Sequence, residues 1–185
     1  MVMESKKSKF KTLNLVYIAL FSVLITICSW IYVPTVVPFT LQTFAIFCAL
    51  CLLGGKLGTC SIIVYILLGV VGIPVFAGFN GGVGALLGAT GGYIIGFIFM
   101  GLIYWLITGI FGNKTYISFI AMILGLAVCY AIGTAWFMFV YIQKSGSISL
   151  LSVLGLCVFP FIIPDMIKMI LAVFLAKKLA CCVKV

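Results

Sequence analysis

The sequence predicts an all-α integral membrane protein with six transmembrane helices in a single domain, residues 1–185. Composition, mean hydropathy and the placement of charge predict it. Of the 185 residues, 66% are apolar and 7% are charged, whereas soluble domains carry about 25% charged residues. The mean hydropathy is +1.46. Polar side chains are too few to cover a water-soluble fold of this size, so soluble enzymes and soluble binding modules are excluded.

The expected spans are apolar runs separated by glycine, proline or polar residues, because a helix that crosses a bilayer needs roughly 20 apolar residues. They cover residues 13–32, 42–54, 58–73, 89–111, 116–141 and 160–176. The first run is longer than the apolar part of a typical signal peptide, and no A-x-A-like cleavage site follows it. We therefore interpret it as a retained helix. A glycine turn at 54–58 separates the short second and third spans, and a polar stretch with a moderately apolar connector precedes the sixth.

The eleven basic residues are all lysines, and their distribution predicts the orientation of the chain. Cytoplasmic loops carry an excess of Lys and Arg. With the N-terminus inside, Lys144 is outside, Lys168 lies within a span and nine lysines are cytoplasmic: Lys6, Lys7, Lys9, Lys11, Lys56, Lys114, Lys177, Lys178 and Lys184. We therefore expect both termini in the cytoplasm. Because these lysines flank spans, the net charge of +9 predicts contact with the lipid bilayer and no nucleic-acid partner.

Two connections on the outer side are apolar and yet unsuited to regular helix. Residues 33–41 contain two prolines, and residues 74–90 contain many glycines. Proline and glycine break or loosen a helix. Irregular backbone at membrane depth persists only where it is buried in protein or lines a cavity. We therefore expect both connections to fold over something at the outer side.

Two rows of small residues repeat at every fourth position. They are Gly84, Gly88, Gly92 and Gly96, and Ala127, Ala131 and Ala135. Such rows let helix backbones approach closely in lipid. We expect them to pack inside the bundle; the alternative is a face that docks a partner subunit.

Asp165 and Lys168 form the strongest local signal for function. They are the only acid–base pair within any expected span, and their spacing of three places them on one face of a helix. Ionisable groups at such depth are costly and indicate a functional site. The alternative is an ion pair that only holds the bundle together. Since a carboxylate accepts hydrogen bonds and an ammonium donates them, the pair suits a small ligand that carries both kinds of group.

Other residues near the outer connections complete a candidate ligand site. A small-molecule site is mostly apolar with a few placed polar groups. The polar candidates are Asn80, Gln42, Thr43 and Tyr93, and the aromatic candidates are Phe39 and Phe76. Thr40 and Thr90 lie in the same stretches.

Several chemistries are missing from the sequence. There is no ATP-binding Gly-x-x-x-x-Gly-Lys-Ser/Thr motif, and no histidine for a catalytic triad, a zinc site or a proton relay. Most of the eight cysteines lie in apolar runs, where cysteine packs as a small hydrophobic residue. We therefore expect no enzyme activity, no metal and no cofactor.

Several long motifs resemble one known family. They are Val-Pro-Phe-Thr-Leu-Gln-Thr-Phe-Ala at 37–45, Gly-Val-Val-Gly-Ile-Pro-Val-Phe-Ala-Gly at 69–78, Gly81-Gly82, the glycine-rich stretch 87–97 and Pro164-Asp165-x-x-Lys168. Together they resemble the BioY family, the biotin-specific S components of energy-coupling factor (ECF) transporters. The resemblance spans about residues 13–178.

The resemblance implies a six-helix S-component bundle in the bacterial plasma membrane that binds biotin from the outer side. Biotin is then the transported ligand. The implied partners are a transmembrane coupling subunit and two ATP-binding subunits. Residues 33–41 would form a lid, and the loaded subunit would topple in the membrane. The alternatives are an S component for another vitamin and a structural subunit without a ligand.

Biotin also suits the candidate residues. We expect Asp165 to accept a hydrogen bond from a ureido N–H, with Asn80 or Gln42 completing the bonds of that ring. Lys168 would bind either the ureido carbonyl or the ligand's carboxylate, and the sequence leaves this open. The chain departs from the family at the coupling surface, where an Ala-x-x-x-Ala pattern in the first helix reads Ala19 followed by Val23. The face that docks the coupling subunit is therefore left open too.

Overall fold

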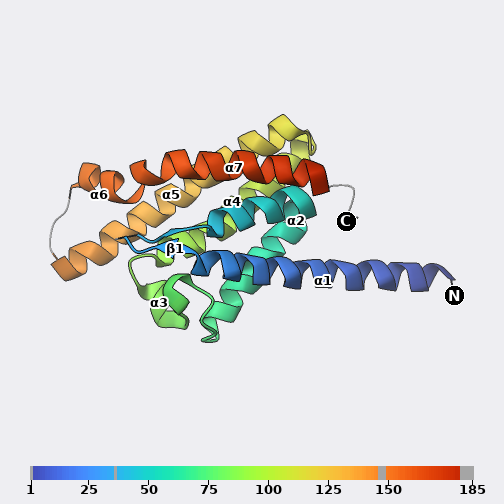
Figure 1. Cartoon of the computed structure of the whole chain (residues 1–185), viewed down its shortest axis with the longest axis horizontal. Coiled ribbons are helices and arrows are strands. Elements are labelled where there is room, and N and C mark those ends of the chain that lie inside the picture. Colours follow the sequence, from blue (N-terminus) through green and yellow to red (C-terminus); the bar gives the residue numbers. More distant parts are fainter. Residues whose placement is uncertain (1, 36, 146–148, 180–185) are drawn as a thin grey trace.

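The computed structural model describes residues 2–35, 37–145 and 149–179, with side chains described from Thr12 to Gln143 except residue 36, and from Ser149 onwards. Within this part of the chain, five helical stretches are long and apolar enough to cross a membrane. They contain α1 (Val2–Trp30), α2 (Gln42–Val70), α4 (Gly91–Phe111), α5 (Thr115–Ser145), and α6 with α7 (Leu150–Cys157 and Phe159–Leu179). The helices form one elongated bundle (Figure 1).

Helix α2 contains the second and third expected spans. Gly54 breaks it with φ 75° and ψ 173°, a backbone conformation that only glycine adopts readily. The chain changes direction there, so the two halves of α2 run along different lines (Figure 1). Each of the six expected spans is therefore largely helical, but the turn expected over 54–58 shrinks to one residue. The first span, expected over 13–32, lies in α1 and ends at Trp30, so Tyr32 is in a strand instead. The third span also ends at Val70 instead of residue 73.

The other spans end close to their expected positions, and one helix was missed. The fourth, fifth and sixth spans differ from the observed helices α4, α5 and α7 by four residues or fewer at each end. The connector before the sixth span contains α6, which the sequence did not predict. Ser149 caps this helix, because its Oγ accepts a hydrogen bond from the N–H of Ser152 at 3.2 Å. Apolar residues follow this cap directly.

The two irregular connections lie at the end of the bundle opposite the beginning of α1 and the end of α7 (Figure 1). The first connection contains a hairpin in which β1 (Tyr32–Val33) pairs antiparallel with β2 (Phe39–Thr40). Residues 74–90 contain η1 (Ala77–Phe79) and α3 (Val83–Leu87). Trp30 holds the second connection against α1: its Nε1 donates to the Pro74 carbonyl at 2.9 Å, and its ring stacks on Phe79.

Close packing of α4 on α5 depends on glycine. A Cβ added at Gly92 would lie 2.2 Å from Cβ of Trp136, and one added at Gly96 would lie 2.9 Å from Sγ of Cys129. These two members of the glycine row therefore pack inside the bundle, as expected. The alanine row does not: Ala127, Ala131 and Ala135 are exposed on α5. The prediction of internal packing is wrong for that row, because the neighbouring Gly125–Cys129–Gly133 face is the one turned towards α4.

We expect Gly92→Ala to destabilise the protein. The added methyl group cannot occupy its place unless α4 and α5 move apart, and overpacking of this kind costs about 1–3 kcal/mol. Gly109→Ala is the matched control on the same helix, because no atom lies within 4 Å of its added Cβ. Thermal unfolding in detergent measures both. A melting temperature for Gly92→Ala equal to that of Gly109→Ala would contradict this account of the interface.

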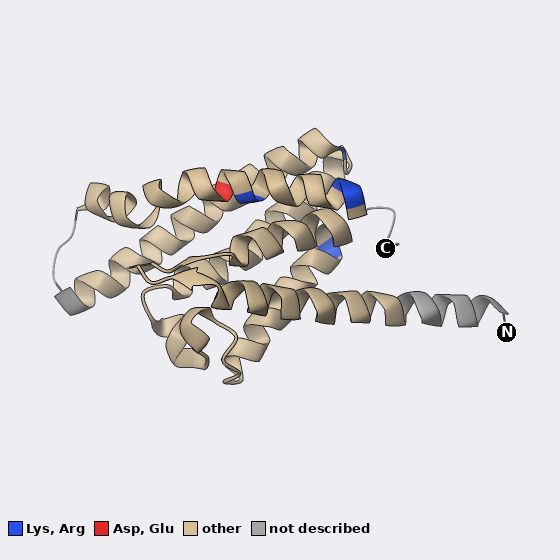
Figure 2. Ribbon diagram, in the orientation of Figure 1, with Lys and Arg blue, Asp and Glu red and all other residues tan. Residues whose placement is uncertain are grey.

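The described lysines divide into two groups. Four of them are exposed and gather at the end where α1 begins and α7 ends (Figure 2): Lys56, Lys114, Lys177 and Lys178. The fifth, Lys168, is buried beside Asp165 in the middle of α7. The remaining lysines of the predicted topology lie outside the described side chains: Lys6, Lys7, Lys9, Lys11, Lys144 and Lys184.

Candidate ligand-binding site

A cavity of about 480 Å³ lies between the hairpin, the start of α2, the 74–90 connection and helices α4 to α7. This volume is in the range of pockets that hold small organic ligands, about 300–1,000 Å³. Seven of the eight residues predicted from the sequence line it: Gln42, Thr43, Phe76, Asn80, Tyr93, Asp165 and Lys168. The irregular connections thus border a cavity, as expected for non-helical backbone at this depth.

Asp165 and Lys168 project from one face of α7. The Nζ–Oδ1 distance is 2.8 Å, and the residues are only 2% and 6% exposed, respectively. Removing two charges from water is costly unless further hydrogen bonds satisfy their remaining lone pairs and protons. The surroundings of this pair supply such bonds on both sides.

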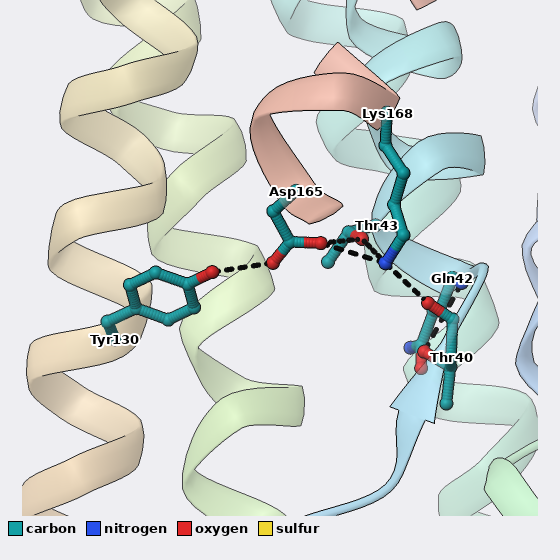
Figure 3. A network of polar contacts seen from close by, with 6 residues as sticks. All are labelled: Thr40, Gln42, Thr43, Tyr130, Asp165 and Lys168. Carbon is teal, nitrogen blue, oxygen red and sulfur yellow. Dashed lines mark hydrogen bonds and ion pairs between the residues drawn. The ribbon is translucent and has the colours of Figure 1, made fainter. Parts of the chain in front are cut away.

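Asp165 is held by three groups from three elements (Figure 3). Its Oδ1 accepts from Lys168 and from the hydroxyl of Thr43 on α2, both at 2.8 Å. Its Oδ2 accepts from the hydroxyl of Tyr130 on α5 at 2.6 Å. Because hydrogen bonds to an ionised acceptor are about twice as strong as neutral ones, these contacts fix the carboxylate at the meeting point of α2, α5 and α7.

Lys168 connects this centre to the hairpin. Its Nζ donates to the main-chain carbonyl of Thr40 in β2 at 2.7 Å and to Oγ1 of Thr43 at 3.1 Å, besides its bond to Asp165. The same ammonium lies 4.1 Å from the centre of the Phe39 ring, within the range of a cation–π contact. Phe39 does not itself line the cavity; its ring lies near that of Phe161 on α7, with centroids 5.9 Å apart.

Gln42 and Phe76 shape the wall near the 74–90 connection. Nε2 of Gln42 donates to the hydroxyl of Tyr65 at 3.0 Å, and that hydroxyl donates to the Val75 carbonyl at 3.2 Å. The Phe76 ring is buried edge-on against Tyr65. It occupies the space left by Gly69, where an added Cβ would lie 2.0 Å from the ring. Gln42 is thus oriented by its bond to Tyr65.

Asn80 and Tyr93 have different surroundings. Asn80 is exposed, and its Nδ2 donates to the Ala77 carbonyl at 2.8 Å, which holds the turn after η1. Tyr93 is buried on α4, with its hydroxyl 3.4 Å from that of Thr134. Asn80 therefore lies where the cavity reaches the surface, and Tyr93 lies against its inner wall.

Tyr130 is the residue at this site that sequence reasoning missed. It lines the cavity and binds Asp165, although 35 residues separate the two. Its sequence signal is weak: it directly follows Cys129 on the buried face of α5. A tyrosine beside a helix-packing face more often packs than binds, so only the position of α5 against α7 reveals its partner.

The fold and the cavity define a multi-pass membrane protein with a partly buried site for a small molecule that accepts and donates hydrogen bonds. Residues 3–184 match the BioY family, and the chain belongs to that family. The biotin transporter BioY of Thermotoga maritima is 36% identical over 90% of this chain and 95% of its own length. The probable biotin transporter BioY of Pyrococcus horikoshii is 44% identical over 77% of this chain and 80% of its own.

A solved structure has the same fold. The crystal structure at 2.1 Å of the S-component for biotin from an ECF-type ABC transporter matches with a TM-score of 0.80 and 31% identity. The match covers 92% of each chain. The resemblance noted in the sequence motifs is therefore confirmed over nearly the whole chain.

Proposed function

We propose that this chain is the biotin-binding S component of an ECF-type transporter and mediates biotin uptake. The observation that carries the proposal is the buried Asp165–Lys168 pair at the wall of a 480 Å³ cavity, in a chain whose relatives are biotin transporters. The function is transport, not catalysis. Biotin is the transported ligand.

The ureido ring of biotin complements this pair. Each carboxylate oxygen has two lone pairs, and Oδ2 of Asp165 uses one of them for Tyr130. The other is available for a ureido N–H. The apolar lining, which includes Phe76, Phe97 and Leu126, suits the thioether ring and the alkyl chain. Gln42 and Asn80 are the candidates for the remaining polar contacts of the ligand.

The lysines support the orientation predicted from the sequence. The four exposed lysines lie at the end opposite the hairpin (Figures 1 and 2). By the positive-inside rule this end faces the cytoplasm. Both termini are then cytoplasmic, and the cavity opens towards the outside of a bacterial plasma membrane. The hairpin takes the position of a lid over the outer side of the cavity.

The partners follow from the transporter class. An ECF-type transporter supplies a transmembrane coupling subunit and two ATP-binding subunits, which energise uptake. Ala19 and Val23, at the position of the family's Ala-x-x-x-Ala pattern, are both exposed on α1, so this face is one accessible candidate for the docking surface that the sequence leaves open.

Calorimetry of the detergent-purified, ligand-free protein with biotin tests the proposal. We expect tight binding with one biotin per chain. A panel of other vitamins, titrated under the same conditions, distinguishes biotin from another substrate of the same transporter class. Folded, ligand-free protein that takes up no biotin would refute the assignment, and binding of another vitamin in its place would identify the substrate.

Tyr130→Phe is expected to weaken biotin binding by about tenfold, because it removes one hydrogen bond to an ionised carboxylate. The aromatic ring and its packing stay in place. Tyr116→Phe is the matched control, since Tyr116 is 61% exposed and outside the cavity lining. Calorimetry compares the two variants. Equal affinities would mean that Tyr130 does not orient Asp165 for the ligand.

A further inference from the structure

The charge balance of the cavity bears on which end of the ligand it recognises. Among its lining residues, all within the described part of the chain, Asp165 is the only acid and Lys168 the only base. These two residues pair with each other at 2.8 Å. The lining therefore has no net charge, whereas biotin carries a carboxylate at the end of its tail.

The ammonium of Lys168 is already fully hydrogen-bonded within the protein. An ammonium has three N–H groups, and Lys168 has three acceptors: the Thr40 carbonyl, Oγ1 of Thr43 and Oδ1 of Asp165. A ligand carboxylate could pair with this ammonium only by displacing one of them. Lys168 as a whole residue is only 6% exposed, so it is shielded from bulk water.

Each displacement is unfavourable. If the ligand's carboxylate replaced Asp165, it would leave a buried anion without its cation, which strongly destabilises a protein. If it replaced the Thr40 carbonyl or Oγ1 of Thr43, two carboxylates would share one ammonium and repel each other at close range. The uncharged ureido ring creates neither conflict, because it can bind Asp165 while the ion pair stays intact.

The other side of the cavity offers the tail a place near water. Asn80, Gly81 and Gly84 line the cavity and are exposed. A Cβ added at Gly84 would have no atom within 4 Å, so this wall has room for additional atoms. A charge near the surface gains little from a nearby protein charge, because water screens it.

We infer that the site recognises the ureido head of its ligand and accepts a tail that ends in an uncharged group, so that biotin amides are ligands as well as biotin. This inference rests on the proposed function. It also decides the alternative that the sequence leaves open: Lys168 does not pair with the ligand's carboxylate.

Competition calorimetry with biotin, biotinamide and lipoic acid tests the inference on the unmodified protein. Biotinamide has the same rings and a neutral tail, whereas lipoic acid has a carboxylate-ended pentanoic tail on a ring without N–H groups. We expect the affinity for biotinamide to lie within about fivefold of that for biotin, the range of an exposed ion pair. We expect lipoic acid not to compete. A loss of a hundredfold or more for biotinamide, or competition by lipoic acid, would overturn the inference.

Lys168→Met supplies a second, independent comparison. If Lys168 does not pair with the carboxylate, the variant loses affinity for biotin and for biotinamide by the same factor. A loss confined to biotin would overturn the inference, since it would place the carboxylate on Lys168. If the unmodified protein binds neither compound, both the proposed function and the inference are refuted. If it binds biotin but not biotinamide, only the inference is refuted.

Discussion

Asp165→Asn is expected to weaken biotin binding by about a hundredfold or more, the effect of removing a charged partner from a dry site. The amide has nearly the shape of the carboxylate, so the bundle keeps its packing. Its NH₂ group, however, is a donor that faces further donors in either orientation: Tyr130 and a ureido N–H in the place of Oδ2, or Thr43 and Lys168 in the place of Oδ1. Lys168 also loses its counter-ion. Calorimetry with biotin measures the loss.

Glu4→Gln is the control for this variant. It removes the other acid of the chain, in the lysine-rich start, and changes the net charge by the same amount. We expect it to bind biotin like the unmodified protein. If folded Asp165→Asn also binds biotin with normal affinity, the carboxylate has only a structural role and the site assignment is wrong.

Lys168→Met is expected to loosen the hairpin and to speed the release of biotin. It removes the bond to the Thr40 carbonyl and the contact with the Phe39 ring, while methionine keeps most of the alkyl chain. Asp165 is left buried without its cation, which costs about 3–5 kcal/mol of stability in comparable cases. We therefore expect a lower melting temperature, a dissociation rate raised by about tenfold or more, and faster hydrogen exchange over residues 31–41.

Lys177→Met is the matched control, since it removes an exposed lysine from the same helix. Hydrogen exchange measured by mass spectrometry separates two roles of Lys168. Faster exchange in the hairpin of ligand-free protein indicates that the ammonium holds β2 in place. Unchanged exchange together with lost affinity would contradict this role and would leave Lys168 as a ligand contact alone.

The long helices could be predicted from sequence because each depends on local information. The apolar runs fix α4, α5 and α7 to within a few residues, and Gly54 marks the break in α2. The spacing of Asp165 and Lys168 likewise places both on one face of a helix without any knowledge of the rest of the fold. Helix α6 escaped prediction because a stretch of eight mostly apolar residues beyond a serine resembles an apolar connector as much as a helix.

The partners of the pair could not be predicted in the same way. Thr43 lies 122 residues from Asp165, and Thr40 lies 128 residues from Lys168. Thr43 was selected for its polarity and its place near a connection. Tyr130 has no comparable signal, since its role depends on how α5 packs against α7. The prediction that the alanine row packs inside the bundle was wrong for a related reason. Both faces of α5 carry small residues, and only the packing of the helices decides which face meets α4.

The bond between Lys168 and Thr40 joins a side chain to the main chain. Any residue at position 40 presents the same carbonyl, so Thr40→Ala would leave this contact intact and would test only the Thr40 side chain, whose Oγ1 accepts from the Gln42 N–H at 3.3 Å. An ester in place of the amide between residues 40 and 41 makes the carbonyl a weaker acceptor and changes no side chain. It also removes the Leu41 N–H, which donates to the Ile31 carbonyl at 3.0 Å, so both bonds of this segment are weakened together.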